Sequence, residues 1–180
     1  ALYEELSGQR SGESTGVLSC AELRKVWKRR AKQITPDDEL IGVYVDALVH
    51  CDALDEALKV LENALQGAAS EILVRQYSLL SLRLNDTEAA QQLQRAETWL
   101  ASRPKDAQLL LALGRISLRN RVWGKAREYF ERSLREHGSP EAFAELARLL
   151  HNLKEQGRSS RFLEAEIKLI SQSLPNFPQP

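Results

Sequence analysis

The chain has 180 residues, of which 43% are hydrophobic and 28% are charged, the composition of an ordinary globular domain or a short repeat array. Its 25 Lys and Arg balance its 25 Asp and Glu, so the whole chain lacks the positive charge that general binding to nucleic acid or to a membrane requires. No run of roughly 18 apolar residues could span a bilayer, and no signal-peptide pattern is present. Because the sequence begins with Ala and contains no Met, we expect a fragment of a longer protein, with any membrane attachment left to a segment absent here.

Short polar segments divide the sequence into helical blocks. Residues 1–6 are predicted to end one helix and residues 7–16 to form a Gly/Ser-rich loop, after which Ser19 is a suitable N-cap for a helix over 20–34. Further helices are predicted over 37–50, 54–67, 71–84, 87–103, 106–119, 123–137, 140–153 and 157–173. No run with alternating polarity indicates a strand, and the proline-rich tail is expected to be frayed.

Small residues recur at a fixed period where paired helices would cross. Gly114 and Ala126 are 12 residues apart, with Phe130 four residues later, and the crossing positions 57, 92, 126 and 159 are spaced by 35, 34 and 33 residues. This pattern resembles that of the tetratricopeptide repeat (TPR), a helical hairpin that stacks into a solenoid. Gln92 and Glu166 depart from the small residues of the pattern, which leaves the register of the second repeat open by about one turn.

Several stretches narrow the resemblance. They are residues 96–100, 103–106, 109–115, 118–120, 123–127 and 139–142. Together they resemble the C-terminal TPR region of the proteobacterial HemY-type proteins, and the Trp-Gly-Lys-Ala sequence at 123–126 is the most specific part. The resemblance implies an N-terminal pair of membrane helices that this chain lacks, association with the inner membrane, and a link to late haem (protoporphyrin) biosynthesis.

The resemblance also implies an architecture. The expected fold is all-α, a TPR solenoid of antiparallel helix hairpins with a right-handed superhelical twist. Residues 1–36 would contain the end of a preceding repeat and a basic helix, residues 37–173 an array of about four repeats with a degenerate second one, and residues 174–180 a flexible tail.

No motif in the sequence points to catalysis. The histidines are His50, His137 and His151, and HExxH, GxSxG, a Gly-rich phosphate loop and a spaced Cys/His quartet are all missing. Cys20 and Cys51, 31 positions apart, are interpreted as two separate thiols, buried or half-buried. We therefore predict a protein that is not an enzyme.

No cofactor follows from the residues themselves. The family resemblance raises haem or porphyrin binding, by a carrier or chaperone, as the alternative function. The axial ligands would then come from the adjacent His50 and Cys51 or from His151, and arginines could hold the porphyrin propionates.

The helix over 20–34 is unusually basic. Arg24, Lys25, Lys28, Arg29, Arg30 and Lys32 crowd around Trp27. The preferred interpretation is a solvated face whose apolar stripe packs on the first repeat. Docking to an anionic lipid surface or to an acidic partner stays open as a functional alternative.

In TPR proteins, side chains from the first helix of each hairpin line a concave groove that binds a peptide. The positions mapped on this sequence include Val74, Tyr77, Ser81, Leu84 and Asn85 in the second repeat, Leu111, Arg115 and Arg119 in the third, and Arg148, His151 and Asn152 in the fourth. Three arginines beside apolar residues suit an acidic peptide or a C-terminal carboxylate, unless Glu141 and Glu145 neutralise them. The predicted function is a scaffold for a protein partner, with haem-pathway enzymes as candidates.

Overall fold

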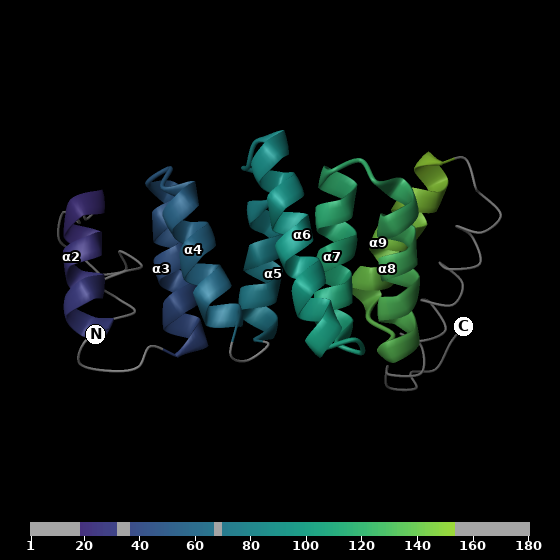
Figure 1. Ribbon diagram of the computed structural model, residues 1–180, viewed down its shortest axis with the longest axis horizontal. Helices are drawn as coiled ribbons and strands as arrows, with labels where there is room; N and C mark the ends of the chain where they lie inside the picture. The colour runs from purple at the N-terminus through teal and green to yellow at the C-terminus, as the bar shows by residue number, and fades with distance from the viewer. Residues whose placement is uncertain (1–18, 32–36, 67–69, 154–180) are drawn as a thin grey trace, which may run out of the picture. The chain divides into compact units, whose positions relative to one another are not determined.

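The computed structural model describes residues 19–31, 37–66 and 70–153, and these residues form eight helices and no strand (Figure 1). The helices are α2 (Cys20–Ala31), α3 (Asp38–His50), α4 (Leu54–Leu65), α5 (Glu71–Leu80), α6 (Asp86–Ser102), α7 (Ala107–Arg119), α8 (Trp123–Glu136) and α9 (Pro140–Asn152). The all-helical prediction is confirmed. The helix predicted over 157–173 and the tail 174–180 lie outside the described residues. The chain divides into two compact units, residues 1–84 and 85–180.

In the first unit, α3 packs against both α4 and α5 around a shared core. The Asp37 side chain caps α3 by accepting a hydrogen bond of 2.8 Å from the backbone N–H of Leu40, which satisfies one of the donors left open at a helix start. Fully buried large side chains fill the space between the helices. They are Tyr44 and Leu48 from α3, Leu61 and Leu65 from α4, and Leu73 and Tyr77 from α5. A local cap and an apolar stripe are therefore enough to define these helices.

In the second unit, α7 packs against α8 over much of its length. A Cβ atom added at Gly114 would lie inside the van der Waals radius of the Phe130 ring, 2.8 Å from its Cζ atom. Ala126 and Phe130 are both fully buried, and they join Leu111 and side chains of α9 in one hydrophobic cluster. The expectation that Gly114 is small because two helices touch there is confirmed.

The register of the second repeat differs from the one with Gln92 at the crossing position. Ala57, Ala89 and Ala126 are each the fourth residue of their helix, in α4, α6 and α8, and all three have no exposed surface. Ala89 therefore occupies the small position, three residues before Gln92. The prediction assumed the same number of residues in every repeat. Since α5 ends at Leu80 and not at the predicted residue 84, that assumption put the second crossing position too late in the sequence.

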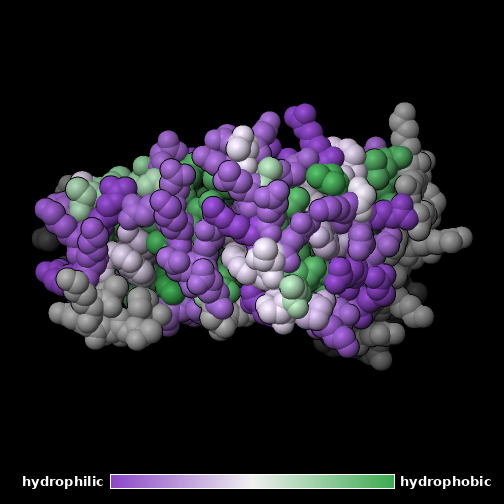
Figure 2. Space-filling model, viewed as in Figure 1, coloured by the Kyte–Doolittle hydropathy of each residue, from purple (hydrophilic) through white to green (hydrophobic). Residues whose placement is uncertain are grey.

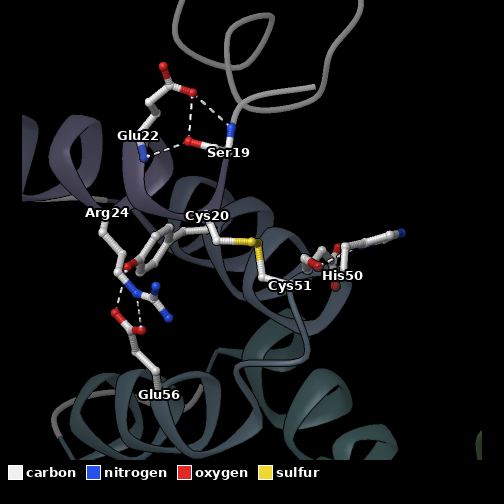
Figure 3. Close-up of a disulfide and its surroundings, with 9 residues drawn as sticks. Ser19, Cys20, Glu22, Arg24, His50, Cys51 and Glu56 are labelled. Atoms are coloured by element: carbon white, nitrogen blue, oxygen red, sulfur yellow. Dashed lines mark hydrogen bonds and ion pairs between the residues drawn. A yellow bond between two sulfur atoms is a disulfide. The ribbon is translucent and has the colours of Figure 1, made fainter. Parts of the chain in front are cut away.

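The two cysteines form a disulfide, so the interpretation of Cys20 and Cys51 as separate thiols is wrong (Figure 3). Cys20 is the first residue of α2 and Cys51 directly follows α3, and their Cα atoms are 5.9 Å apart. In an antiparallel helix pair, the start of one helix lies beside the end of the next. The positions of the two cysteines at these helix ends could therefore have predicted the disulfide from the sequence.

Two further contacts attach α2 to the rest of the first unit. The rings of Trp27 and Tyr44 are stacked, with centroids 4.0 Å apart and an interplanar angle of 4°. Arg24 Nε lies 2.7 Å from Glu56 Oε2, and the Tyr44 hydroxyl donates a hydrogen bond of 3.0 Å to the other oxygen of the same carboxylate. The expected packing of the apolar stripe of this helix is confirmed, and Ser19 caps it as predicted.

Candidate partner-binding site

The arginines predicted to line a groove lie on α7 and α9, and carboxylates accompany them. Arg115 on α7 places its Nη2 atom 2.9 Å from Glu141 and its Nε atom 3.1 Å from Glu145, both on α9. The side chains of Arg115 and Glu145 are only 18% and 14% exposed. Partial burial makes this pair stronger than an ion pair in open water, since water screens it less.

The other two arginines are also matched. Arg148 donates to the second oxygen of Glu145 at 3.1 Å, and Arg119 lies 2.9 Å from Asp86 at the start of α6. Three arginines thus face three carboxylates, and Glu145 bridges two of the arginines. Of the two alternatives open from the sequence, neutralisation by Glu141 and Glu145 is the one that the structure shows. We call Arg115, Arg119, Arg148 and their three carboxylates the paired face.

The remaining predicted groove residues have mixed positions. Tyr77 is 1% exposed and Leu111 is 3% exposed, so both contribute to the cores of their units. Asn85 caps α6, in a capping box with Glu88 whose two hydrogen bonds are 2.9 and 3.1 Å long. Asn152 is exposed near the end of α9. His151 lies in α9, and its side chain is outside the described part of the structure.

The exposed face of α5 was missed by the sequence mapping. Val74, Tyr77, Ser81 and Leu84 are all buried, whereas Ile72, Leu79 and Leu82 are 46%, 46% and 69% exposed. The exposed apolar residues therefore lie two positions before the residues mapped to the groove, and the groove itself stays a prediction. The serine at position 70 precedes the first helical residue, Glu71, and counting from this boundary instead of from the repeat period would have found the face.

Other large apolar side chains are exposed as well, since Val122, Trp123 and Leu153 are 38%, 44% and 40% exposed. The face of the molecule in Figure 2 is mostly hydrophilic, and hydrophobic residues are visible only in small separate areas. Large apolar side chains grouped in water commonly mark binding surfaces. On α5, Arg75 lies between Ile72 and Leu79 along the same stretch of helix and is itself exposed.

Metal ligation, membrane spanning and haem ligation were considered for the described residues. They contain no group of three or more His, Cys, Asp or Glu that could hold a metal ion, and no helix among them is long and apolar enough to cross a membrane. Cys51 is part of the disulfide and cannot act as a thiolate ligand to haem, which corrects its place among the candidate ligands. His50 is exposed, with its Nδ1 atom 2.7 Å from the backbone carbonyl of Asp46.

The sequence and the structure were compared with known proteins to identify the fold. No family model and no curated protein match the sequence. Two solved structures of MamA, a TPR-like helical-repeat protein, match the structure with a TM-score of 0.59. The chain has the TPR-type fold. One is described as the MamA RS-1 ArsTM double mutant, with 15% identity over 85% of both chains, and the other as MamA 41-end from Desulfovibrio magneticus RS-1, with 17% identity over 87% of both chains.

At such low identity, the comparison shows the TPR-type fold alone. The HemY-type resemblance is not supported by the comparisons, and it rests on the sequence stretches named above.

Proposed function

We propose that the chain is a non-catalytic TPR-type scaffold that binds a protein partner, with α5 of the first unit as the main contact. The observation that carries the proposal is a group of exposed apolar side chains on α5 and in the turn that follows it. Ile72 and Leu79 of α5 are each 46% exposed, and Leu82 of the turn is 69% exposed. Ile72 and Leu79 are separated by two helical turns, so they lie on one face and a partner segment meets them together. Their burial would supply the affinity.

The paired face of the second unit has a different role in this proposal. Its arginines are already neutralised by carboxylates, and an incoming carboxylate would have to compete with Glu141 and Glu145. Arg148 is the most accessible of the three, with 68% of its side chain exposed. We assign to Arg148 and Asn152 contacts that orient a partner and select its charge, and not the main contribution to affinity.

The test replaces Ile72, Leu79 and Leu82 by Ser and measures which proteins cross-link to the chain in an extract of the source cells. Val122→Ser is the matched control, because Val122 is also apolar and is 38% exposed, at the start of α8. We expect the triple variant to lose a partner that the wild type and the control retain. An identical set of partners for all three chains would refute binding through α5.

The link to haem biosynthesis, through a pathway enzyme as partner, is supported only by the HemY-type resemblance. A direct haem carrier is less favoured, because Cys51 is held in the disulfide and leaves His50 as the one donor of that pair. Titration with haemin tests it. We expect weak binding that His50→Ala and His151→Ala do not change, whereas a sharp absorption shift lost in one of these variants would establish the carrier function.

We also propose a location. A disulfide between Cys20 and Cys51 persists in an oxidising compartment and is rare in the cytosol, which supports the outer side of the inner membrane. Alkylation of thiols in cells quenched with acid tests this. Protection of both cysteines until a reductant is added is the expected result, and alkylation of both without reductant would place the domain in a reducing compartment.

A further inference from the structure

The helix α2 is held in place by three contacts of different kinds, all on one side of it. Two of them, the Cys20–Cys51 disulfide and the pairing of Arg24 with Glu56, are drawn in Figure 3. The third is the stack of Trp27 on Tyr44. Leu23, on the same side, is 3% exposed. A short helix of 12 residues is marginal by itself in water, so these contacts are what define its position.

The opposite side of α2 carries positive charge. Lys25, Lys28 and Arg29 are exposed and lie at relative positions i, i+3 and i+4, which places them together on one face. We call these three residues the basic face. Among the described residues, no acidic side chain lies within ion-pairing distance of any of them.

The nearest acids are already engaged. Glu22 accepts hydrogen bonds of 2.9 and 2.8 Å from the backbone and hydroxyl of Ser19, and it attracts Lys25 only at longer range. Glu56 is paired with Arg24 and Tyr44 and attracts Lys28 at longer range. Three like charges at this spacing repel one another, and an outside anion would relieve the repulsion.

Burial of the apolar residues decides which kind of anion fits. Helices that lie on a membrane insert an apolar face below the headgroups, but Leu23 of α2 is buried and Trp27 stacks on Tyr44 of α3. The basic face alone would supply only electrostatic attraction to an anionic membrane surface, without the insertion of apolar side chains. It is also too small, in a chain of zero net charge, for general nucleic-acid binding. A protein segment with closely spaced carboxylates can instead form hydrogen-bonded pairs with Lys25, Lys28 and Arg29 simultaneously.

We propose that the basic face of α2 is a docking site for an acidic segment of a partner protein, and that the disulfide keeps this site in position. The site is separate from the α5 face and does not depend on it. The disulfide fixes the start of α2, so the cations are presented in one geometry and little entropy is lost on binding. Reduction of the disulfide leaves only the aromatic stack and the ion pair, and α2 becomes more mobile.

The experiment measures binding of a fluorescein-labelled poly-glutamate peptide to the full chain by anisotropy at low and moderate salt. The test variant is Lys25→Gln, Lys28→Gln and Arg29→Gln together. Lys105→Gln, Arg121→Gln and Arg135→Gln together form the control, because these three cations are also exposed and the change in net charge is the same. We expect about tenfold weaker binding for the test variant, or about 1.4 kcal/mol, and less than about a twofold change for the control.

Three further measurements complete the test. Melting curves confirm that both variants fold, and an equal loss of peptide binding by the two variants would overturn the proposal. Vesicles containing phosphatidylserine give the competing result, because capture that depends on the basic face and exceeds peptide binding would assign the site to a membrane. Reduction of the disulfide is expected to weaken peptide binding several-fold, and unchanged binding would remove the disulfide from the proposal.

Discussion

The basic face of α2 and the paired face of α7 and α9 each have three cations, yet they present different surfaces. On α7 and α9, every arginine has a carboxylate within 3.1 Å. On α2, Arg24 has such a partner, and the three cations of the basic face do not. The difference shows that a count of cations says little about a binding surface until their partners are known.

The reason lies in the neighbours. Arg115 meets Glu141 and Glu145 because α9, the first helix of the next hairpin, carries these two acidic side chains to the side of α7 where Arg115 lies. The helix α2 packs on α3, and its acidic contacts are used on the packed side by Arg24. The arginines of α7 and α9 are neutralised by acidic side chains of α6 and α9, whereas the basic face of α2 has no such neighbour among the described residues.

The largest expected loss of stability comes from a substitution that forces α7 and α8 apart, since α7 carries two arginines of the paired face. Gly114→Leu should lower the free energy of unfolding by about 3 kcal/mol, because the new side chain would occupy the space of the Phe130 ring. Gly124→Leu is the matched control, since nothing lies within 4 Å of its added Cβ. Urea denaturation measures both. Equal losses would show that the α7–α8 contact is not what limits stability.

A smaller loss should follow from removing the disulfide that holds α2. Cys20→Ser with Cys51→Ser should reduce the free energy of unfolding of the oxidised protein by about 2–3 kcal/mol, because the unfolded chain is no longer constrained. The measurement is thermal unfolding with and without reductant. The wild type should fall to the level of the variant when reduced, and a wild type insensitive to reductant would contradict the prediction.

Removing carboxylates should convert the paired face into a second basic face. Glu141→Gln with Glu145→Gln is expected to cost about 1–2 kcal/mol of stability, since Arg115 is 82% buried and loses both charged partners. The same variant should bind poly-glutamate several-fold more tightly than the wild type. Glu39→Gln with Glu136→Gln, two exposed positions, controls for net charge. An equal gain in affinity for poly-glutamate by both double variants would show that the pairs of Arg115 with Glu141 and Glu145 do not control binding.

The smallest expected effect is a dependence on pH of the stability that the Arg24–Glu56 pair gives to the packing of α2. Burial raises the pKa of Glu56, but the hydrogen bonds from Arg24 and Tyr44 outweigh it and hold that pKa below its usual value. The stability from this pairing is therefore complete above the unfolded pKa and is lost as the pH falls through the lower folded pKa. Wild type and Glu56→Gln should converge in melting temperature below about pH 4 and diverge at neutral pH. A constant difference across that range would exclude the pairing as its source.

Local patterns predicted the helices well because each depends on residues close in sequence. Asp37 and Asp106 cap α3 and α7 within one residue of the predicted starts, through bonds to N–H groups three residues away or fewer. The third repeat was also placed correctly, since Gly114, Ala126 and Phe130 are linked by one hairpin. The second repeat was placed wrongly, because its first helix, α5, ends at Leu80 and not at the predicted residue 84.

By itself, the sequence determined an all-helical chain with the TPR-type fold, since caps, apolar stripes and the crossing of paired helices are encoded at short spacing. Only the tertiary structure decided which side of α5 is exposed, that Cys20 meets Cys51, and which cations already have a carboxylate. These properties join residues about 30 positions apart, such as Arg115 and Glu145. Their side chains meet through packing whose geometry depends on loop lengths and helix ends, and a shift of one or two residues there changes every partner.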